Sequence, residues 1–520
     1  MNKIRTYFYK FIKLFFNRIF YIGVAFILQF LWILMTVRIL RLNSRYTSLI
    51  INVLTIVVVL IIVNHDINPS YKLTWSVLIL GIPVFGLVIY LLFGRSRIAK
   101  KMEKQFSDLQ NDPGFWRHIS EDGLKQLKKL NPDVGKQAHY IQKVAGYPVH
   151  QNTSAEYFQV GDELFPRLLA ELEAAEHFIF IEYFIINNGV MWHEILNILE
   201  RKAADGVDVQ LIYDGFGCLT TLSNKYCNEL RAKGIKCEVF NPFRPILNVI
   251  QNNRDHRKLC IIDGHTGFTG GINLADEYIN RKRRFGHWKD TAIMLKGDAV
   301  WNMTVMFLHM WHVVTNSKDS IQYELYRPEK YLKTKIDGSG FVQPFCDSPL
   351  DEEIVGENVY LNIIHNAQKY VYICTPYLII DNEIMTSLCL AAKNGIDVRI
   401  MTPGIPDKKI VFLLSQSYYR TLLEAGVKIY EYQPGFLHAK SFVSDDDIAV
   451  VGTINLDYRS LYLHFEDGVW MYKNKIVEDI RDDFEHTLYS CKEVPLSFCR
   501  NRSIFVRIIQ NVMRLIAPLL

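Results

Sequence analysis

The 520-residue sequence has no arrangement of cysteines that would form a zinc site or a disulfide framework. Its nine cysteines are irregularly spaced, none forms a CxxC pair, and none has histidine partners at zinc-ligand spacing, so we interpret them as reduced thiols. Low-complexity segments are also absent, and hydrophobic residues make up 49% of the chain, which excludes an extensively disordered protein. The net charge of +5 is small for this length and does not indicate a nucleic-acid partner.

Long apolar runs, in contrast, are abundant in the first hundred residues. They cover residues 19–37, 48–63 and 75–93, and they contain almost no charge. A bilayer core of about 30 Å needs roughly 20 helical residues. No small-residue cleavage site follows the first run, which argues against a cleaved signal peptide. We expect residues 1–105 to be a membrane anchor rather than three helices buried in a soluble core.

The distribution of basic residues predicts how this anchor is oriented. Basic residues lie before the second run and after the third, whereas the loop at 65–72 carries little positive charge. We therefore predict a hairpin of transmembrane helices near 48–63 and 75–93, with the rest of the chain on the cytoplasmic side of the cell membrane. Both ends of the run at 19–37 are basic, so we expect an interfacial or re-entrant first segment.

From about residue 110, short apolar runs alternate with helical patterns, and the order occurs twice. Strands predicted at 177–181 and 207–213 correspond to strands predicted at 369–373 and 395–400. Because the copies are about 192 residues apart, the repeat indicates a duplicated domain rather than a solenoid. The sequence predicts an α/β fold with mixed or largely parallel sheets flanked by helices. We place the first half at 106–335 and the second at 336–500.

The most polar segment of the chain also occurs in both copies, in the form His-x-Lys-x-x-x-x-Asp followed by Gly-x-x-Asn. Its residues are His256, Lys258, Asp263 and Asn273 in the first copy and His438, Lys440, Asp445 and Asn455 in the second. On a strand, residues two apart face the same side, so each His and its Lys point into one space. Two such segments at equivalent places in a repeat indicate a functional site rather than two strand-end histidines satisfied by their neighbours.

If the halves pack face to face, these segments form a site that suits a phosphodiester. A neutral histidine can attack phosphorus, and a protonated histidine can protonate the leaving alkoxide. The two lysines, together with Asn273 and Asn455, can hold the non-bridging oxygens. Two fixed cations make a metal unnecessary, and we identify no carboxylate cluster that would hold one, so we expect neither a metal nor another cofactor.

These residues resemble the phospholipase D superfamily, whose duplicated HxKxxxxD motif they match without gaps, over about residues 140–490. The resemblance implies a phosphohistidine intermediate and favours His256 as the nucleophile. It also implies that a carboxylate downstream of each Gly-x-x-Asn orients a histidine, and the matching positions are Asp290 and Glu466. The alternative for these two is a plain surface carboxylate. We expect Asp263 and Asp445 to brace the fold rather than to touch substrate.

Other segments are similar to bacterial cardiolipin synthases, so that this resemblance covers nearly the whole chain. They are residues 82–95, Glu182-Tyr183-Phe184, Tyr213-Asp214-Gly215, Thr375-Pro376-Tyr377 and Pro518-Leu519-Leu520. The resemblance implies transphosphatidylation, in which two phosphatidylglycerol molecules give cardiolipin and glycerol. An anionic lipid substrate suits the basic runs at 281–284 and 408–409, which otherwise form a solvated surface.

Other functions are compatible with the same superfamily. They are a hydrolytic phospholipase D, a phosphatidyltransferase with another donor or alcohol, a membrane-tethered nuclease and a non-catalytic scaffold. A nuclease would need a long basic groove with stacking aromatics, which we do not identify, so we expect no nucleic-acid partner. Intact His and Lys residues in both copies argue against a scaffold. The sequence leaves the oligomeric state open.

Residues 501–520 predict a basic amphipathic helix at the C-terminal end of the sequence. No acidic residue follows Glu493, and apolar residues recur at helical spacing at positions 504, 505, 508, 512 and 515. Such a helix either packs its apolar face on the body of the protein or lies on the anionic inner leaflet of the membrane.

Overall fold

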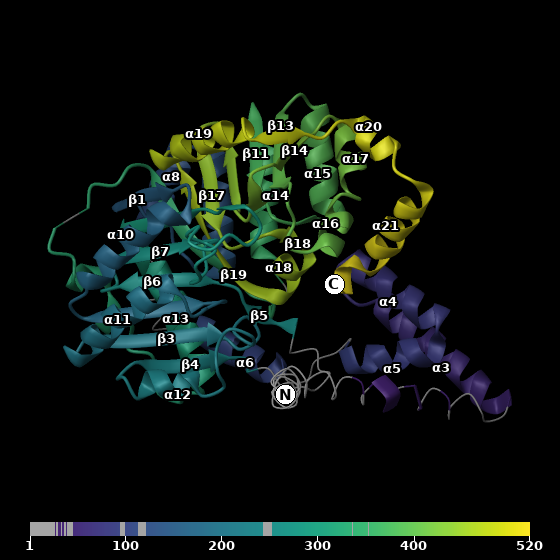
Figure 1. The fold of residues 1–520 in the computed structure, drawn as a ribbon, viewed down its shortest axis with the longest axis horizontal. Coiled ribbons are helices and arrows are strands. Elements are labelled where there is room, and N and C mark those ends of the chain that lie inside the picture. The colour runs from purple at the N-terminus through teal and green to yellow at the C-terminus, as the bar shows by residue number, and fades with distance from the viewer. Residues whose placement is uncertain are drawn as a thin grey trace, which may run out of the picture. The chain divides into compact units, whose positions relative to one another are not determined.

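The computed structural model describes residues 45–93, 99–112, 121–242, 252–334, 336–351 and 353–519, together with a few single positions between 27 and 38. The chain forms two compact units. The first contains residues 1–100, 243–253 and 518–520, and the second contains residues 101–242 and 254–517. Figure 1 shows the elements along the chain, and each unit is described here by itself.

Three helices make up most of the described part of the first unit: α3 (Arg45–Val63), α4 (Pro69–Gly81) and α5 (Pro83–Phe93). The proline at the start of α4 suits a first helical turn, where no N–H is needed, and the side chain of Asn68 caps this turn by accepting a hydrogen bond from the backbone of Ser70. A small apolar core joins the three helices. It consists of Ile62, Trp75, Ile79, Leu87 and Tyr90.

The expected hairpin of transmembrane helices is not confirmed. The run at 75–93 belongs to two helices rather than one, because Pro83 lacks an N–H and disfavours helical backbone at Ile82, which has φ −136° and ψ 75°. Within the described ranges, no helix combines the length and the apolar character needed to cross a membrane. The predicted interfacial or re-entrant first segment cannot be compared with the structure, because most of the run at 19–37 and the residues before it lie outside the described residues.

The first half of the second unit is built on a seven-stranded mixed sheet with the order β1-β9-β7-β6-β2-β3-β4. β2, β3 and β4 are parallel, and the other neighbours are antiparallel. Apolar residues on both faces of β2 are buried, because helices cover both sides of the sheet. On one side, Phe180 stacks on Phe307 of α13 (Val300–Thr315). On the other side, Ile179 and Ile181 belong to a core shared with α10 (Gly161–Glu173) and α11 (Val190–Ala204). The strands are β1 (Thr153–Phe158), β2 (Phe178–Tyr183), β3 (Asp208–Asp214), β4 (Lys236–Phe240), β6 (Lys258–Ile262), β7 (Thr266–Gly270) and β9 (Ala292–Gly297).

The sheet of the second half repeats this order strand for strand, as β10-β19-β17-β16-β11-β13-β14, with β20 added at one edge. The predicted strands at 369–373 and 395–400 are β11 and β13, in the places of β2 and β3. The predicted duplication and the mixed sheets flanked by helices are therefore confirmed. The strands are β10 (Phe341–Asp347), β11 (Tyr370–Cys374), β13 (Asp397–Pro403), β14 (Lys428–Tyr432), β16 (Ser441–Ser444), β17 (Ile448–Gly452), β19 (His464–Tyr472) and β20 (Cys491–Glu493).

Five short strands lie outside these orders and form pairs near the motif segments. β12 (Leu378–Ile379) pairs with β18 (Leu456–Asp457) within the second half. β5 (Arg254–Asp255) pairs with β19, and β8 (His287–Lys289) pairs with β15 (Gly435–Leu437), so these two pairs connect the halves.

Helices also cross between the halves. α9 and the π-helix η1 precede the first sheet in the chain, but they pack against α14 and β10 of the second half, where Gln343 donates to the carbonyls of Ala138 and Tyr147. α19 lies between β19 and β20 of the second sheet in the chain, and it contacts β1 of the first sheet. The helices of this unit are α6 (Ala99–Gln110), α8 (Asp122–Leu130), α9 (Pro132–Tyr140), η1 (Ile141–Ala145), α10 (Gly161–Glu173), α11 (Val190–Ala204), α12 (Tyr226–Arg231), α13 (Val300–Thr315), α14 (Val355–Asn366), α15 (Asn382–Lys393), α16 (Lys409–Ser415), α17 (Tyr419–Ala425), α18 (Tyr458–Leu463), α19 (Ile476–Leu488), α20 (Leu496–Arg500) and α21 (Ile504–Ile516).

One aspartate in each half fixes the start of a central strand. Asp263, in the turn after β6, accepts hydrogen bonds of 2.8 Å from the backbone N–H groups of residues 176, 177 and 178. Asp445, in the turn after β16, does the same for residues 368–370. The two have φ values of 50° and 58°, in the left-handed region that Asp adopts more readily than most residues. Each aspartate therefore ties its motif hairpin to the beginning of β2 or β11.

We expect Asp263→Ala and Asp445→Ala each to lower the free energy of unfolding by about 2–4 kcal/mol, because three backbone donors lose a charged acceptor. Thermal unfolding of the full-length chain measures this, with the exposed Asp205→Ala as the control that leaves the midpoint nearly unchanged. An unchanged midpoint in the Asp263 and Asp445 variants would contradict the bracing role.

Candidate active site

The histidines and lysines of the two motif segments meet in one buried site. His256 and His438 are each 7% exposed, and Lys258 and Lys440 are each 1% exposed. Lys258 is the first residue of β6, and Lys440 directly precedes β16, so both side chains lie where a motif strand enters its sheet. The charges of both lysines act on His256, which shows that the two segments are close neighbours.

Backbone pairing between the halves holds the two segments in place. β5, which leads into His256, pairs in parallel with the start of β19, and β15, which leads into His438, pairs in parallel with β8. The backbone N–H of His256 donates to the carbonyl of Phe465 at 2.9 Å, and that of His438 donates to the carbonyl of Lys289 at 2.7 Å. Each catalytic motif is therefore fixed by hydrogen bonds to the other half.

The carboxylate of Glu466, on β19 of the second half, orients His256 of the first half. Its two oxygens lie 2.9 and 2.8 Å from Nδ1 of His256, and the side chain is fully buried. Ser460, on α18, donates to the same carboxylate at 2.5 Å. Because an ionised carboxylate accepts a hydrogen bond from Nδ1–H, the other nitrogen of the neutral ring, Nε2, has a free lone pair.

Asp290, which follows β8 in the first half, has the same relation to His438 of the second. Its Oδ2 lies 2.6 Å from Nδ1 of His438, and its Oδ1 accepts a hydrogen bond from the backbone of Thr291. Nζ of Lys440 lies 2.9 Å from the same ring nitrogen and also donates to the carbonyl of His438. The carboxylate of each half thus orients the histidine of the other half, an exchange that sequence analysis did not reveal.

Burial keeps both histidines neutral in the free protein. It lowers the pKa of His256 well below 6.5, and the charges of Lys258 and Lys440 lower it further. It also lowers the pKa of His438 to about 4, with Lys440 adding to the effect and Asp290 opposing it. Burial lowers the pKa of Lys258 to about 8 and that of Lys440 to about 7. The lysines therefore lose their protons just above neutral pH.

The two asparagines predicted to hold phosphate have different surroundings. Asn273 uses its amide inside the first half, where Oδ1 accepts from the backbone of Ile185 at 3.0 Å and Nδ2 donates to the hydroxyl of Tyr278 at 2.7 Å. Asn455 is 5% exposed, and its Oδ1 has no hydrogen-bond partner among the described residues. Because Oδ1 is an acceptor, it is available to a donor such as a hydroxyl group, and only the Nδ2 group of Asn455 can donate to a phosphate oxygen.

Not every predicted residue lies at this site. Asp263 and Asp445 directly follow β6 and β16, at the ends opposite the lysines, where they accept backbone hydrogen bonds. The basic run at 281–284 is exposed, and its Arg284 pairs with Glu277. Lys408 is also exposed, but its charge lowers the pKa of His256, which places it near the site.

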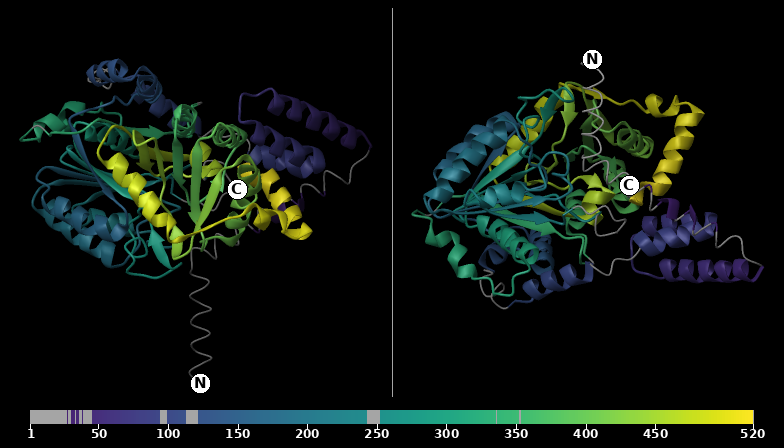
Figure 2. Two further views of the ribbon diagram at one scale, coloured as in Figure 1. Left: turned by 90° about the horizontal axis from the view of Figure 1, so that it is seen from above. Right: turned by 60° about the horizontal axis from the view of Figure 1, so that its bottom comes forward.

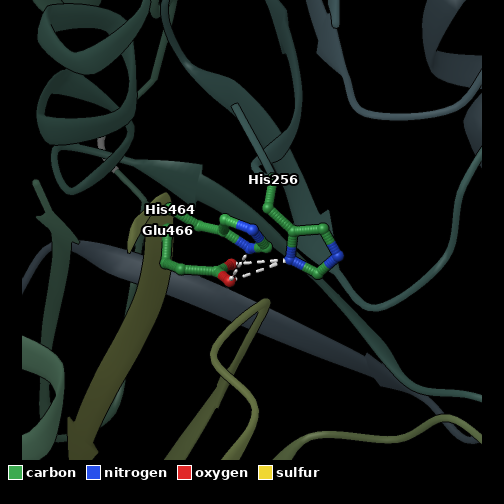
Figure 3. A group of neighbouring side chains, drawn as sticks. All are labelled: His256, His464 and Glu466. Atoms are coloured by element: carbon green, nitrogen blue, oxygen red, sulfur yellow. Dashed lines mark hydrogen bonds and ion pairs between the residues drawn. The ribbon is translucent and has the colours of Figure 1, made fainter. Parts of the chain in front are cut away.

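His464 is a site residue whose significance the sequence analysis missed. It lies two positions before Glu466 on β19, its ring is 5.5 Å from that of His256, and its Nδ1 is 3.7 Å from the Glu466 carboxylate (Figure 3). Neither ring nitrogen has a hydrogen-bond partner within the described part of the chain. The matching position in the first half is Trp288, 5.7 Å from the ring of His438. His256, His464 and Glu466 also have the spacing that a metal ion would need.

The sequence analysis identified no carboxylate cluster that would hold a metal ion, but the structure brings three carboxyl groups together away from the histidines. Glu357 on α14 and two residues at the start of α15, Asp381 and Glu383, place oxygens within 4.8 Å of one another. The hydroxyl of Tyr462 lies 2.8 Å from Glu357 and 2.6 Å from Asp381. Burial and the charge of Asp381 raise the pKa of Glu357 to about 9, so this carboxyl is protonated at neutral pH. The cluster thus contains its own hydrogen-bond donors, which reduces its need for a cation.

Comparisons with known proteins match both halves and the N-terminal region. Residues 168–311 and 360–488 match the family model described as "Cardiolipin synthase, PLD-like domain", and residues 50–95 match "Phospholipase D-nuclease N-terminal". An uncharacterized protein of Streptococcus mutans is 46% identical over 466 residues, which are 89% of this chain and 99% of that protein. Cardiolipin synthase of Geobacillus thermodenitrificans is 35% identical over 485 residues, 91% of this chain and 93% of the relative.

A solved structure supports the fold. The crystal structure of phosphatidylserine synthase from Haemophilus influenzae superposes with a TM-score of 0.57 at 14% sequence identity, over 74% of this chain and 100% of that chain. At this identity the likeness shows a shared fold and no more. The two segments that match the family model contain His256 and His438, each with its lysine. The chain therefore belongs to the cardiolipin synthase family of phospholipase D-like phosphatidyltransferases.

Proposed function

We propose that this protein transfers a phosphatidyl group from one phosphatidylglycerol molecule to a second, which gives cardiolipin and glycerol. The names of the relatives support this substrate class. The observation that best supports the proposal is the pair of contacts between the halves, Glu466 with His256 and Asp290 with His438, beside two buried lysines. We call these two contacts the crossed pairs, because each joins a carboxylate of one half to a histidine of the other. Two oriented histidines provide one nucleophile and one proton carrier, as an exchange of phosphodiesters requires.

In the first step, His256 is the nucleophile, an assignment that follows the family resemblance. The lone pair of its Nε2 attacks phosphorus, a P–N bond forms, and the bond from phosphorus to the headgroup glycerol oxygen breaks. Protonated His438 gives its proton to that oxygen, so glycerol leaves as a neutral alcohol. Asp290 stabilises His438 while it is charged.

In the second step, His438 acts as a base. It accepts the proton of the terminal hydroxyl of the second phosphatidylglycerol, whose oxygen attacks phosphorus. The P–N bond breaks, and its electron pair returns to Nε2 of His256. One phosphodiester replaces another, so the reaction needs no nucleotide.

The charges of the site explain how His438 acquires its proton. Lys258 and Lys440 balance the charges of Glu466 and Asp290, so a phosphodiester adds one negative charge to a buried and otherwise neutral group of residues. That charge raises the pKa of the neighbouring histidines, and one proton on His438 restores the balance. The lysines hold the non-bridging oxygens, and we assign the same role to the amides of Asn273 and Asn455.

We further propose that the first unit holds the protein in the cell membrane as a multi-pass anchor, with the active site on the cytoplasmic side next to anionic lipids. α3 supports this, because large apolar side chains around the helix are 44–65% exposed, an arrangement that is unfavourable in water and favourable in lipid. They are Leu49, Ile50, Val53, Leu54, Ile56, Val57, Leu60, Ile61 and Val63.

Purified full-length protein with phosphatidylglycerol as its sole lipid is expected to form cardiolipin and glycerol in equal amounts, measured by mass spectrometry. His256→Ala and His438→Ala should each lower the rate by at least about 10³-fold, because neither histidine can take over the role of the other. Labelled phosphatidyl group trapped on His438 instead of His256 would reverse the two roles.

The products also separate the alternatives. Phosphatidic acid with glycerol, in place of cardiolipin, would identify a hydrolytic phospholipase D, and absence of turnover would contradict both activities. The assay buffer contains EDTA, which removes divalent metal ions, because in the proposed mechanism the lysines supply the positive charge that balances the phosphate. A strict requirement for one divalent ion would overturn the metal-free mechanism.

Removing the charge of either orienting carboxylate tests whether the carboxylate of one half orients the histidine of the other half. Glu466→Gln and Asp290→Asn preserve side-chain shape but deprive His256 and His438 of their charged partners. We expect kcat to fall by about 10²–10⁴-fold in each variant with little change in KM, because the carboxylates act on the histidines and not on the substrate. Glu277→Gln, a buried carboxylate paired with an arginine outside the site, is the matched control. Unchanged kcat in either site variant would contradict the crossed arrangement.

The lowered lysine pKa values predict an alkaline limit to activity. As pH rises through about 7 and then 8, Lys440 and Lys258 lose the charges that bind phosphate, so kcat/KM should fall. The fall in kcat should come at higher pH, because the bound phosphodiester anion stabilises the protonated lysines. Initial rates between pH 5.5 and 9.5, at one fixed lipid composition, measure both curves. A kcat/KM that stays constant up to pH 9 would refute this assignment.

A further inference from the structure

The C-terminal helix α21 exposes its apolar face and buries one polar residue and one methionine. Gln510 and Met513 are its buried residues, at 6% and 9% exposure. The opposite face carries six large apolar side chains that are 39–76% exposed, and we call this set the α21 face. It consists of Ile504, Phe505, Ile508, Ile509, Val512 and Ile516. In a helix of a water-soluble domain the apolar face normally packs on the core, so the orientation of α21 is the reverse of the usual one.

Polar contacts to the body of the second unit fix this orientation. Nε2 of Gln510 donates to the carbonyl of Leu413 on α16 at 2.9 Å. The guanidinium of Arg514 lies 4.5 Å from the ring centroid of Tyr418. Figures 1 and 2 show α20 and α21 running along the outside of the second half. The α21 face therefore points away from α16 because specific contacts hold it there.

The charged residues of α21 and of the segment just before it are all basic. Arg500, Arg502, Arg507 and Arg514 lie in or just before α21, and no acidic residue follows Glu493. A helix with a continuous apolar face and only basic charge is typical of segments that lie in the surface of an anionic bilayer. An exposed apolar face and basic side chains together make reversible binding to that surface favourable.

We propose that α21 docks the second unit onto an anionic lipid bilayer, with the α21 face inserted at the boundary between headgroups and acyl chains. The residues after α21, 518–520, belong to the first unit, and Leu519 packs against the apolar core of that unit. α21 is thus joined directly to the unit that we propose as the membrane anchor. The identification of phosphatidylglycerol as the anionic lipid rests on the proposed function, whereas insertion into anionic lipid does not.

A polarity-sensitive fluorescent amino acid in place of Ile508 tests the insertion in the full-length chain and leaves the nine cysteines untouched. The protein is reconstituted into vesicles of phosphatidylglycerol. Quenchers attached to lipid acyl chains are expected to quench the label, while dissolved iodide should not reach it. The same label in place of Asp205, an exposed residue at the end of α11, is the control and should respond to iodide alone.

Two results would overturn the proposal. One is a label at position 508 that remains accessible to iodide in these vesicles. The other is a label protected from iodide but not quenched by lipid, with a signal that depends on protein concentration, which would indicate that the α21 face binds a second copy of the chain. Neither result depends on whether the protein makes cardiolipin.

The effect on turnover is tested with a triple variant of the α21 face, Ile504→Gln, Phe505→Gln and Ile508→Gln. Its rate on phosphatidylglycerol vesicles should fall by about tenfold or more, and its rate on short-chain phosphatidylglycerol monomers should not change. The matched control replaces Val190, Leu325 and Leu390 with Gln, because these side chains are also apolar and 47–51% exposed. The control should retain both rates. An equal loss on vesicles and on monomers in the triple variant would contradict a docking role.

Discussion

The contact between the Glu466 carboxylate and His256 joins residues from different halves of the chain, and so does the contact between Asp290 and His438. Neither half alone contains a histidine together with the carboxylate that orients it. The parallel pairs β5–β19 and β8–β15 add backbone hydrogen bonds directly beside these contacts, so the distance between the motifs is fixed by the sheets and not by side chains alone. The interleaved helices have the same consequence, because α9, η1 and α19 could not keep their packing if the halves separated. The active site therefore exists only as long as the interface between the halves is intact.

Burying this many ionisable groups is unfavourable unless each has a partner. The site meets that condition with equal numbers of lysines and carboxylates, and with histidines that burial keeps neutral. Under the proposed mechanism a phosphodiester binds here because its negative charge stabilises the charged form of both lysines, whose pKa values burial lowers. The same low polarity that lowers the lysine pKa values strengthens their interaction with the charge that develops on phosphorus.

Much of this architecture could be predicted from the sequence, because it depends on local patterns. The repeated strands and the two motifs follow from apolar periodicity and residue spacing, and the sheets match strand for strand. The resemblance to the phospholipase D superfamily implied the positions of Asp290 and Glu466, but not the histidine that each contacts, because the packing of the halves decides it. His464 was missed since only its place beside Glu466 gives it significance. The cluster around Glu357 was missed because the packing of α14 against the start of α15, and not residue spacing, brings its carboxylates together. The break at Pro83 was visible in the sequence, and the long apolar run wrongly outweighed it.

The two crossed pairs are not equivalent, and their differences favour the proposed roles of the histidines. Glu466 accepts a hydrogen bond from Ser460 in addition to that from His256, so its negative charge is shared between two side-chain donors. Asp290 receives a short contact from His438 and otherwise accepts only a neighbouring backbone N–H among the hydrogen bonds described here. A carboxylate with fewer competing donors stabilises an imidazolium more strongly. His438 is therefore better suited to carry a proton between leaving group and acceptor. His256, beside a more fully satisfied carboxylate, is better kept neutral, which is the state in which its Nε2 can attack phosphorus.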